Sequence, residues 1–543
     1  MLNVQDEKIS LTEQSSENEL TDIDPIVKGS QRKLHARHLR FLALGGSIGT
    51  GLFIATGNIL STGGPGSVMI NLVILSFMIV TVLFAIGEFA ALYPLPGLYT
   101  SCISRFLDPS LGFAIGLDYT LTWLIILPVE LTAVTIVIGY WDTEEVVPKG
   151  VWIVIVMLFV FGINVIGVQA YGEFEVFATS IKMISIIGFI IFSIIVTCGG
   201  PPVNHYYGAQ YWHDPGAFNN GFKGFCSVFV FGAFSFGGSE LIGITAAEAA
   251  HPRKQLPRAC KMVIYRVLIF FILALFMVTL TVPYDDEALL GSSNNPRASA
   301  FVLAIKRTGE HTLASVFNGA ILISVISVAN SAVYASSRLM VGMSQQKLIP
   351  KFMGYMDSKG RPWPAMLLSF MFGCLAFLVY STSESEVFSW LVGISGLATI
   401  FVWGIVSLAH VRFRLAWKAQ NLTAADLPWA SPLGIYGSIF SFVINFLLVA
   451  GNLYYAAFPI GEGAPEETPQ KRAHDFFESM ISFVVVLFTF ILHKLITRAP
   501  FVRFSEIDLM SQRRDPVSSE QLQAEKKEFA ALPLWKRITH TLF

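Results

Sequence analysis

Long apolar runs separated by short polar segments dominate this chain from residue 39 to residue 497. We count twelve runs of about 20 residues with few charges, a length that crosses the hydrocarbon core of a bilayer as a helix. Because backbone groups in lipid must be hydrogen-bonded within the protein, we expect each run to be helical. The expected spans are 39–60, 67–92, 110–140, 151–168, 174–198, 222–245, 263–283, 312–337, 364–381, 387–410, 436–458 and 476–497.

Glycine is concentrated in the first run. The stretch LALGGSIGTGLFIATG places Gly45, Gly46, Gly49 and Gly51 close together, and each glycine costs about 1 kcal/mol relative to alanine in a helix interior. Two explanations are open. Gly45 and Gly49 have the spacing of close helix–helix packing, whereas such a dense cluster also favours a break in the helix.

A second interrupted run lies five spans later. In FVFGAFSFGGSELIGITAAEA, Gly237 and Gly238 precede Ser239 and Glu240 near the middle of the sixth span. Because five is an odd number, a second five-span unit starting here would run upside down relative to the first. Paired interruptions at matching positions of inverted repeats indicate the central substrate site of a transporter, so the pairing favours breaks over simple packing.

Free backbone groups in the middle of the membrane would suit a ligand that carries two opposite charges. The N-termini of half-helices favour an anionic group, and freed carbonyls favour a cationic group. An α-amino acid carries both a carboxylate and an ammonium, so we predict an amino-acid substrate. A polyamine, choline or GABA is the alternative within transport, but these molecules lack the α-carboxylate geometry.

Charge distribution predicts the orientation and completes the domain organisation. Lysine and arginine are concentrated at 28–40, 253–261, 347–361 and 412–418, as in cytoplasmic loops, although the loop after the seventh span is a partial exception. We therefore expect even-numbered spans to end in the cytoplasm and both termini to be cytoplasmic. The expected parts are a disordered tail at 1–38, a transporter domain at 39–497 with inverted repeats at about 39–198 and 222–410 and extra spans at 436–497, and a polar tail at 498–543.

Composition supports an all-α membrane protein in contact with the lipid bilayer. Hydrophobic residues make up 53% of the chain and charged residues 14%, with a mean hydropathy of +0.60 and a net charge of −1. The five cysteines have no paired spacing, so we expect neither a metal site nor a disulfide framework, and no cofactor. We find no nucleophile–base pair, metal cluster or phosphate-binding loop, so an enzyme is disfavoured, and no nucleic-acid partner is expected.

Several motifs resemble those of the fungal amino-acid permeases, within the amino acid–polyamine–organocation superfamily. They are GGSIGTGLF, GEFEVFATSIKMISIIGFII, HPRKQLPRA, NSAVYASSRLMVGMSQQKLIPKF, ISGLATIFVWGIVSLAHVRFRLAWKAQ and the tail EIDLMSQRR. The resemblance covers nearly the whole chain. It implies the leucine-transporter fold, with twelve spans and a 5+5 inverted repeat, and import of amino acids with protons at the plasma membrane. NSAVYASSR and KGRPWP favour a general or broad-range member; a narrower cationic or neutral amino-acid permease and an amino-acid sensor are the alternatives.

The resemblance also assigns the substrate site. The break in span one comprises Ile48, Gly49, Thr50 and Gly51, whose amides would hold the substrate carboxylate. The break in span six comprises Phe236, Gly237, Gly238, Ser239 and Glu240. Phe236 would be an aromatic lid over the substrate, although Phe234 could take that role or Phe236 could simply pack. Glu240 is an intramembrane acid that would act on the substrate or hold the half-helix in place.

Two further charges lie deep in the predicted spans. Lys182 is eight residues into span five, which corresponds to a depth of about 12 Å. Loss of hydration disfavours its charged form, so Lys182 could bind and release the coupling proton; a fixed cation that satisfies carbonyls of spans one and eight is the alternative. Glu130 lies near mid-depth in span three and would face the pocket or pair with Lys182.

Other polar residues keep two interpretations each. Glu88 would be structural or part of an inner gate. Asn330, Ser331 and Tyr334 would line the pocket or satisfy span one, and Trp403 would gate or pack. In the N-terminal tail, Lys8, Lys28 and Lys33 are candidate sites for ubiquitin, attached through ubiquitin-ligase adaptors, although solvated surface lysines are the common alternative.

Overall fold

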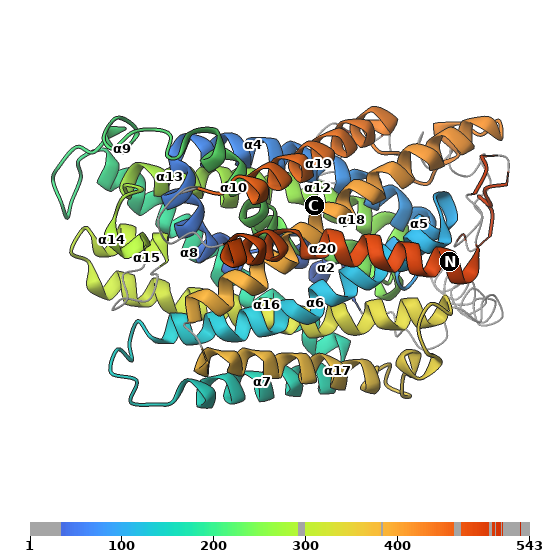
Figure 1. Cartoon of the computed structure of the whole chain (residues 1–543), viewed down its shortest axis with the longest axis horizontal. Helices are drawn as coiled ribbons and strands as arrows, with labels where there is room; N and C mark the ends of the chain where they lie inside the picture. Colours follow the sequence, from blue (N-terminus) through green and yellow to red (C-terminus); the bar gives the residue numbers. More distant parts are fainter. Residues whose placement is uncertain are drawn as a thin grey trace, which may run out of the picture.

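Helices that run back and forth along one axis make up the protein (Figure 1). The computed structural model describes residues 34–290, 299–381, 384–460 and 469–498, and within the C-terminal tail 502–504, 506–511, 513, 531 and 533. Extended pairing within these residues is limited to one isolated bridge between Leu34 and Ala249. The predicted all-helical class is therefore confirmed.

The first span is broken, as predicted. It consists of α2 (Ala36–Gly45), the single turn α3 (Thr50–Phe53) and the first turns of α4 (Ala55–Leu92). α4 then bends at Gly64, where φ is +77°, and Pro65 begins the second span. Eleven helical segments of the described chain are long and apolar enough to cross a membrane, and the broken first span brings the total to the predicted twelve.

The remaining helices follow in the predicted order. The spans are α6 (Pro109–Ile138), α7 (Lys149–Ile166), α8 (Val168–Thr197), α10 (Gly221–Phe236) with α11 (Leu241–Ile244) and η2 (Thr245–Glu248), α12 (Pro252–Tyr265) with the π-helical η3 (Arg266–Leu273) and α13 (Ala274–Thr281), α16 (His311–Gln345), α17 (Trp363–Gly373) with η5 (Cys374–Tyr380), α18 (Glu384–Ala419), α19 (Gly434–Ala457) and α20 (Pro469–Thr497). Short connecting helices are α5 (Leu98–Phe106), α9 (Gln210–His213), α14 (Glu287–Leu290), α15 (Ala300–Lys306), η4 (Lys351–Gly354) and η6 (Ala424–Asp426). In Figure 1, α9, α14 and α15 lie at the left end of the molecule and α5 lies toward the right end.

Several helices extend beyond the apolar runs that predicted them. α8 begins at Val168 rather than at 174, and the seventh span begins at Pro252 rather than at 263. The reason is physical: hydropathy marks the part of a helix in hydrocarbon, whereas backbone hydrogen bonding continues into polar residues beyond it.

The first described residues, from Leu34 on, fall within the predicted N-terminal tail and contact the bundle. Leu34 is fully buried, and its backbone N–H donates to the carbonyl of Glu248 at 3.2 Å. α2 then starts at Ala36. Lys8, Lys28 and Lys33 lie outside the described residues.

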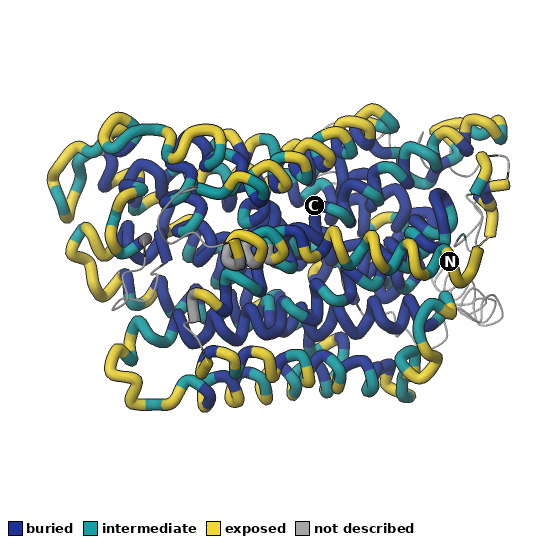
Figure 2. The backbone as a smooth tube through the Cα atoms, in the orientation of Figure 1, coloured by how far each residue is buried: buried dark blue, intermediate teal, exposed yellow. Residues whose placement is uncertain are grey.

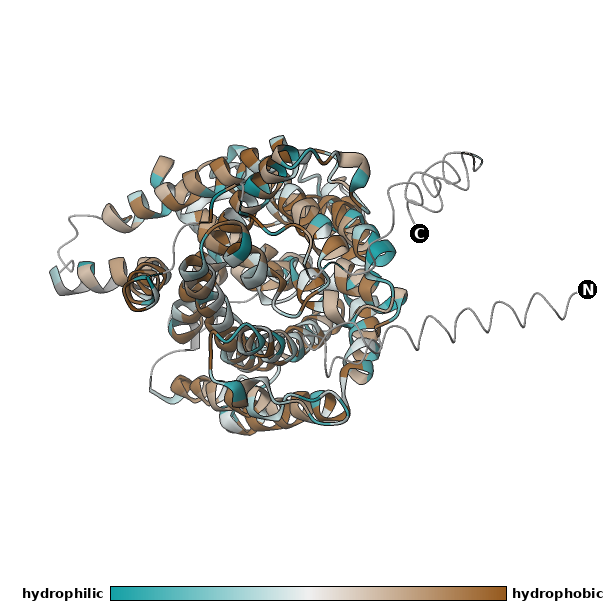
Figure 3. Cartoon of the chain, turned by 90° about the vertical axis from the view of Figure 1, so that its right-hand side faces the viewer, coloured by the Kyte–Doolittle hydropathy of each residue, from teal (hydrophilic) through white to brown (hydrophobic). Residues whose placement is uncertain are grey.

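Buried residues gather at the centre of the bundle, and its outer helices expose one side (Figure 2). In the apolar window of α6, 83% of the residues are buried, against 11% in α20. The exposed sides of the outer helices carry many large hydrophobic residues (Figure 3). An apolar exterior around a polar-lined interior fits contact with lipid.

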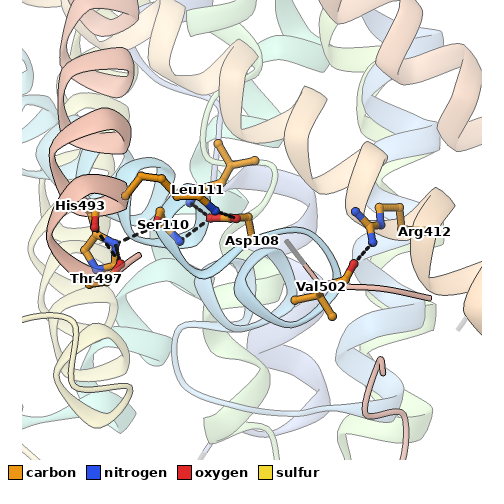
Figure 4. Close-up of polar contacts among 8 residues, drawn as sticks. Asp108, Ser110, Leu111, Arg412, His493, Thr497 and Val502 are labelled. Carbon is orange, nitrogen blue, oxygen red and sulfur yellow. Dashed lines mark hydrogen bonds and ion pairs between the residues drawn. The ribbon is translucent and has the colours of Figure 1, made fainter. Parts of the chain in front are cut away.

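The end of α20 is attached to the start of α6 by buried polar contacts (Figure 4). Asp108 caps α6 by accepting from the N–H groups of Ser110 at 2.7 Å and Leu111 at 3.2 Å. The second oxygen of the same buried carboxylate forms an ion pair with Lys494 of α20. His493 Nδ1 lies 3.0 Å from Ser110 Oγ, so two adjacent α20 residues contact the same cap.

The C-terminal motif EIDLMSQRR lies against the same end of the bundle. Ile507 and Leu509 are buried, and the hydroxyl of Tyr93, which follows α4, donates to the Leu509 carbonyl at 2.8 Å. Arg412 of α18 donates to the carbonyl of Val502 (Figure 4). The described residues of this motif therefore pack against the bundle.

We expect Lys494→Met to loosen α20. The substitution leaves the buried Asp108 carboxylate with only its backbone donors, and because Lys494 is partly exposed the loss should be about 1–2 kcal/mol. Thermal unfolding of the detergent-solubilised protein should show a lowered midpoint. Lys418→Met, at an exposed position near the end of α18, is the control and should leave the midpoint unchanged; equal midpoints for both variants would contradict the attachment.

Candidate functional site

Two interrupted helices meet in the middle of the bundle. Helical structure stops at Gly45 and resumes at Thr50 in span one, and it stops at Phe236 and resumes at Leu241 in span six. Gly238 has φ +87°, a conformation that side chains other than glycine rarely adopt. A Cβ placed there would lie 3.1 Å from the carbonyl oxygen of Gly46, so the two breaks touch.

In the same two spans, α3 and the end of α10 pack backbone against backbone. Ser235 Oγ donates to the carbonyl of Gly51 at 2.7 Å. A Cβ on Gly51 would lie 2.5 Å from the Cα of Ser235, so only glycine fits at this position. The predicted glycine clusters therefore serve both chain interruption and close approach.

A small cavity lies between the breaks. Seven predicted site residues line it, namely Gly49, Thr50, Gly51, Glu130, Gly237, Gly238 and Glu240. The other lining residues are Ser47, Thr122, Trp123, Ile126, Phe234, Val328 and Thr399. Its space holds about one or two water molecules, so an amino acid would have to widen it.

Three of the ten predicted substrate-binding residues lie outside the cavity lining. Phe236 is fully buried and stacks on Phe271 with ring centroids 4.5 Å apart, whereas Phe234 lines the cavity. Residues two apart on a helix point in nearly opposite directions, so only one of the two phenylalanines can face the ligand. Ile48 is fully buried away from the cavity, and the hydroxyl of Ser239 donates to the carbonyl of Phe236.

Glu130 connects span three to the break in span one. Its carboxylate accepts a hydrogen bond from Thr50 Oγ1 at 2.6 Å. The second carboxylate oxygen has no hydrogen-bond partner within the described residues, although it is buried. Burying an unpaired polar atom is costly, so this oxygen is available to a ligand or a proton.

Glu240 holds the break in span six. Its carboxylate accepts from the hydroxyl of Tyr119 at 2.9 Å and from the N–H of Gly238 at 3.3 Å, and Tyr99 donates to its backbone carbonyl. The residue also lines the cavity, so both of its predicted roles remain compatible with its position.

Lys182 lies near the middle of α8. α8 starts at Val168, fourteen residues earlier, which places Lys182 about 21 Å along a 30-residue helix. Its fully buried ammonium donates to the carbonyl of Gly45 at 3.1 Å and to Ser327 Oγ at 2.9 Å. The side chain therefore connects the end of α2 with α16.

Arg266 is a buried charge that the sequence analysis missed. Its guanidinium donates to the carbonyl of Ala43 at 2.8 Å and to Ser239 Oγ. Arg266 and Lys182 thus approach the C-terminal end of α2 from different helices, where the helix dipole favours cations. A charge within the predicted seventh span was the available signal, because intramembrane charges mark functional positions by default.

Two polar clusters lie between the cavity and the end of the bundle that carries α5. Glu248 of η2 accepts from the hydroxyl of Tyr334 and from Nε of Arg338, both at 2.6 Å. Tyr334 therefore lies outside the cavity lining and contacts span six rather than span one. Glu88 forms an ion pair with Arg414 at 2.7 Å, and His410 Nε2 lies 3.2 Å from its other carboxylate oxygen.

Three other polar residues are buried by packing or hydrogen bonds. Asn330 accepts from Asn164 at 2.8 Å, and Ser331 Oγ lies 3.1 Å from the hydroxyl of Tyr171. Trp403 is fully buried within α18. None of these three residues is among the residues that line the cavity.

Comparison with known proteins shows similarity over almost the whole chain. The family model for amino acid permeases matches residues 38–506. The amino-acid permease GAP5 of Candida albicans is 42% identical over 97% of this chain and 85% of its own length. The general amino-acid permease GAP1 of Saccharomyces cerevisiae is 41% identical over 93% of this chain and 84% of its own length, and the histidine permease of that yeast is 39% identical over 98% and 89%. With its broken first span and its buried central cavity, this multi-pass membrane protein belongs to the amino acid permease family.

Proposed function

We propose that the protein is a plasma-membrane symporter that imports amino acids together with protons. The observation that carries this proposal is the meeting of two interrupted helices at a buried cavity with free backbone groups. The names of the relatives, which include general amino-acid and histidine permeases, support an amino-acid substrate and favour a broad range. Membership of a permease family favours transport over enzymatic activity.

The substrate carboxylate would bind at the start of α3. The first backbone bond there runs from the N–H of Phe53 to the carbonyl of Gly49, so the N–H groups of Thr50, Gly51 and Leu52 precede it. Such groups favour an anion. The ammonium would face the free carbonyls of the breaks and the buried carboxylates, and Phe234 would cover the substrate in the role predicted for Phe236.

Lys182 would carry the coupling between proton and substrate. Its ammonium donates to the Gly45 carbonyl at the end of α2, which borders the break. Loss of the proton from Lys182 would therefore change a contact beside the break. At a potential of 100 mV, each charge that moves inward gains about 2.3 kcal/mol, which corresponds to about 50-fold accumulation of a neutral substrate.

In this proposal the α5 end and both termini face the cytoplasm, an orientation that the lysine- and arginine-rich loops support. Tail lysines Lys8, Lys28 and Lys33 would then be accessible to ubiquitin-ligase adaptors.

Uptake of a labelled amino acid into cells that lack their own permeases tests the proposal. Each of the twenty amino acids serves as competitor, at about pH 5 and about pH 7, with and without an uncoupler. We expect many competitors to inhibit uptake, and the uncoupler or the higher pH to lower accumulation about tenfold, because the proton gradient drives it. Inhibition by only a few would restrict the protein to a narrower permease, and no uptake of any amino acid would contradict transport and leave the sensor.

A further inference from the structure

Glu175 is a second buried charge on the helix that carries Lys182. The residues are seven positions apart, which is about two turns, so their side chains share one face of α8 at a separation of about 10.5 Å along the axis. Glu175 is fully buried and lies nearer the Val168 end of α8. A buried carboxylate at this depth requires a reason, and the cavity does not supply one because Glu175 does not line it.

A single hydroxyl connects the two charges. Lys182 Nζ donates to Ser327 Oγ at 2.9 Å, and Ser327 Oγ donates to Glu175 Oε2 at 2.8 Å. Both hydrogen bonds point in the same direction, from the ammonium through the hydroxyl to the carboxylate. This is the arrangement in which a proton can pass along a chain of hydrogen bonds without movement of heavy atoms.

The polar path continues from Glu175 toward the α5 end of the bundle. Glu175 also faces Asn330 and Ser331 of α16, and Ser331 contacts the hydroxyl of Tyr171. The ring of Tyr171 stacks on Tyr334 with centroids 4.2 Å apart, and Tyr334 donates to Glu248. Titratable side chains therefore follow one another from Lys182, near the middle of α8, to Glu248 of η2.

The charged groups around this path lie on three elements. On α8, Lys182 faces Glu175 and Tyr171 lies one turn beyond it. Glu130 of α6 faces Lys182 from the cavity side, and Glu248 of η2 faces Tyr171. Asn164 of α7 binds Asn330 and adds no charge. The ammonium is therefore placed between one carboxylate on the cavity side and one on the α5 side.

We propose that Glu175 accepts the transported proton from Lys182 through Ser327 and releases it toward the cytoplasm. In this step the N–H bond of the ammonium breaks and a new O–H bond forms at Ser327, while the original hydroxyl proton of Ser327 moves to Glu175 Oε2. Lys182 becomes a neutral amine, Glu175 a neutral carboxylic acid, and Ser327 is again a hydroxyl. The proton then leaves Glu175 when the α5 end opens. This inference rests on the proposed proton coupling and names the group that completes it.

Glu175→Gln tests the inference in proteoliposomes, with Glu173→Gln as the matched control. Glu173 lies on the same helix, is partly exposed, and pairs with Arg37 and His38 outside the proposed path. For Glu175→Gln we expect proton-driven accumulation and substrate-induced proton uptake to fall about tenfold or more, while exchange of labelled for unlabelled substrate at equal pH persists. Glu175→Asp should recover part of the coupling, and Glu173→Gln should behave as the unmodified protein.

The outcomes separate this inference from the proposed function. If the unmodified protein transports amino acids without protons, the proposed coupling itself is wrong. If the unmodified protein is coupled and Glu175→Gln accumulates substrate equally well, Glu175 is not on the proton path. If Glu175→Gln and Glu175→Asp fold, as judged by gel filtration, but lose exchange together with accumulation, Glu175 serves only as a structural partner of Lys182 and the inference is overturned.

Discussion

Replacement of Gly51 with alanine should reduce amino-acid uptake about 100-fold or more while leaving the protein in the membrane. The added Cβ would lie 2.5 Å from the Cα of Ser235 and 3.1 Å from the carbonyl oxygen of Phe234. Both are backbone atoms of the other interrupted helix and cannot rotate away. The two halves of the site must therefore separate, and a displacement of about 1 Å in a binding site can cost about 100-fold in rate.

Gly188→Ala is the matched control for this prediction. Gly188 is also a helical glycine in a span, but nothing lies within 4 Å of a Cβ built there. Initial rates of labelled amino-acid uptake should be normalised to the amount of protein at the cell surface. Uptake that is equally affected, or equally unaffected, in the two variants would contradict a specific requirement for contact between spans one and six at Gly51.

Replacement of Lys182 with methionine should abolish proton-driven accumulation. The substitution keeps much of the side-chain volume but leaves the Gly45 carbonyl and Ser327 without their buried donor, and the charge of Glu175 without a counter-ion. Removal of one partner from a buried charged network costs about 3–5 kcal/mol. We therefore expect loss of uptake together with reduced stability, measured by transport assay and thermal unfolding.

Lys182→Arg separates coupling from structural support. Arginine keeps a positive charge but does not release its proton in proteins, so the variant should fold and bind substrate yet fail to accumulate it against a gradient. Binding is measured with labelled substrate in detergent, and accumulation in proteoliposomes with an imposed proton gradient. Full proton-driven accumulation by Lys182→Arg would show that deprotonation of this side chain is not needed.

The sequence predicted the architecture because membrane insertion leaves few choices. Apolar length gave twelve helical spans, and the glycines near Thr50 and Gly238 marked both interruptions. Glycine density was informative because an interruption requires positive φ or close backbone approach, and only one residue type provides both. Six predicted residues of the two interruptions line one cavity for this reason, and Glu130 of α6 joins them.

The missed features depend on helix rotation and on which helices pack against one another. Phe234 and Phe236 are equally apolar, and the choice between them rests on a rotation that the local sequence does not encode. Glu175 and Arg266 fell at the edges of the apolar runs at 174–198 and 263–283, where charges normally reach water. Both side chains are nevertheless fully buried, because other helices pack against them: Glu175 accepts from Ser327 of α16, and Arg266 donates to Ala43 of α2.

The most direct test is an experimental structure of the protein in a lipid nanodisc with a transported amino acid bound. Binding at the two interruptions predicts ligand density between Gly49–Gly51 and Gly237–Gly238, with the carboxylate at the N–H groups that begin α3. Spans one and six should remain interrupted without the ligand, since their free backbone groups form the site. Continuous helices in either span, or a transported amino acid bound elsewhere with this cavity closed, would contradict the account.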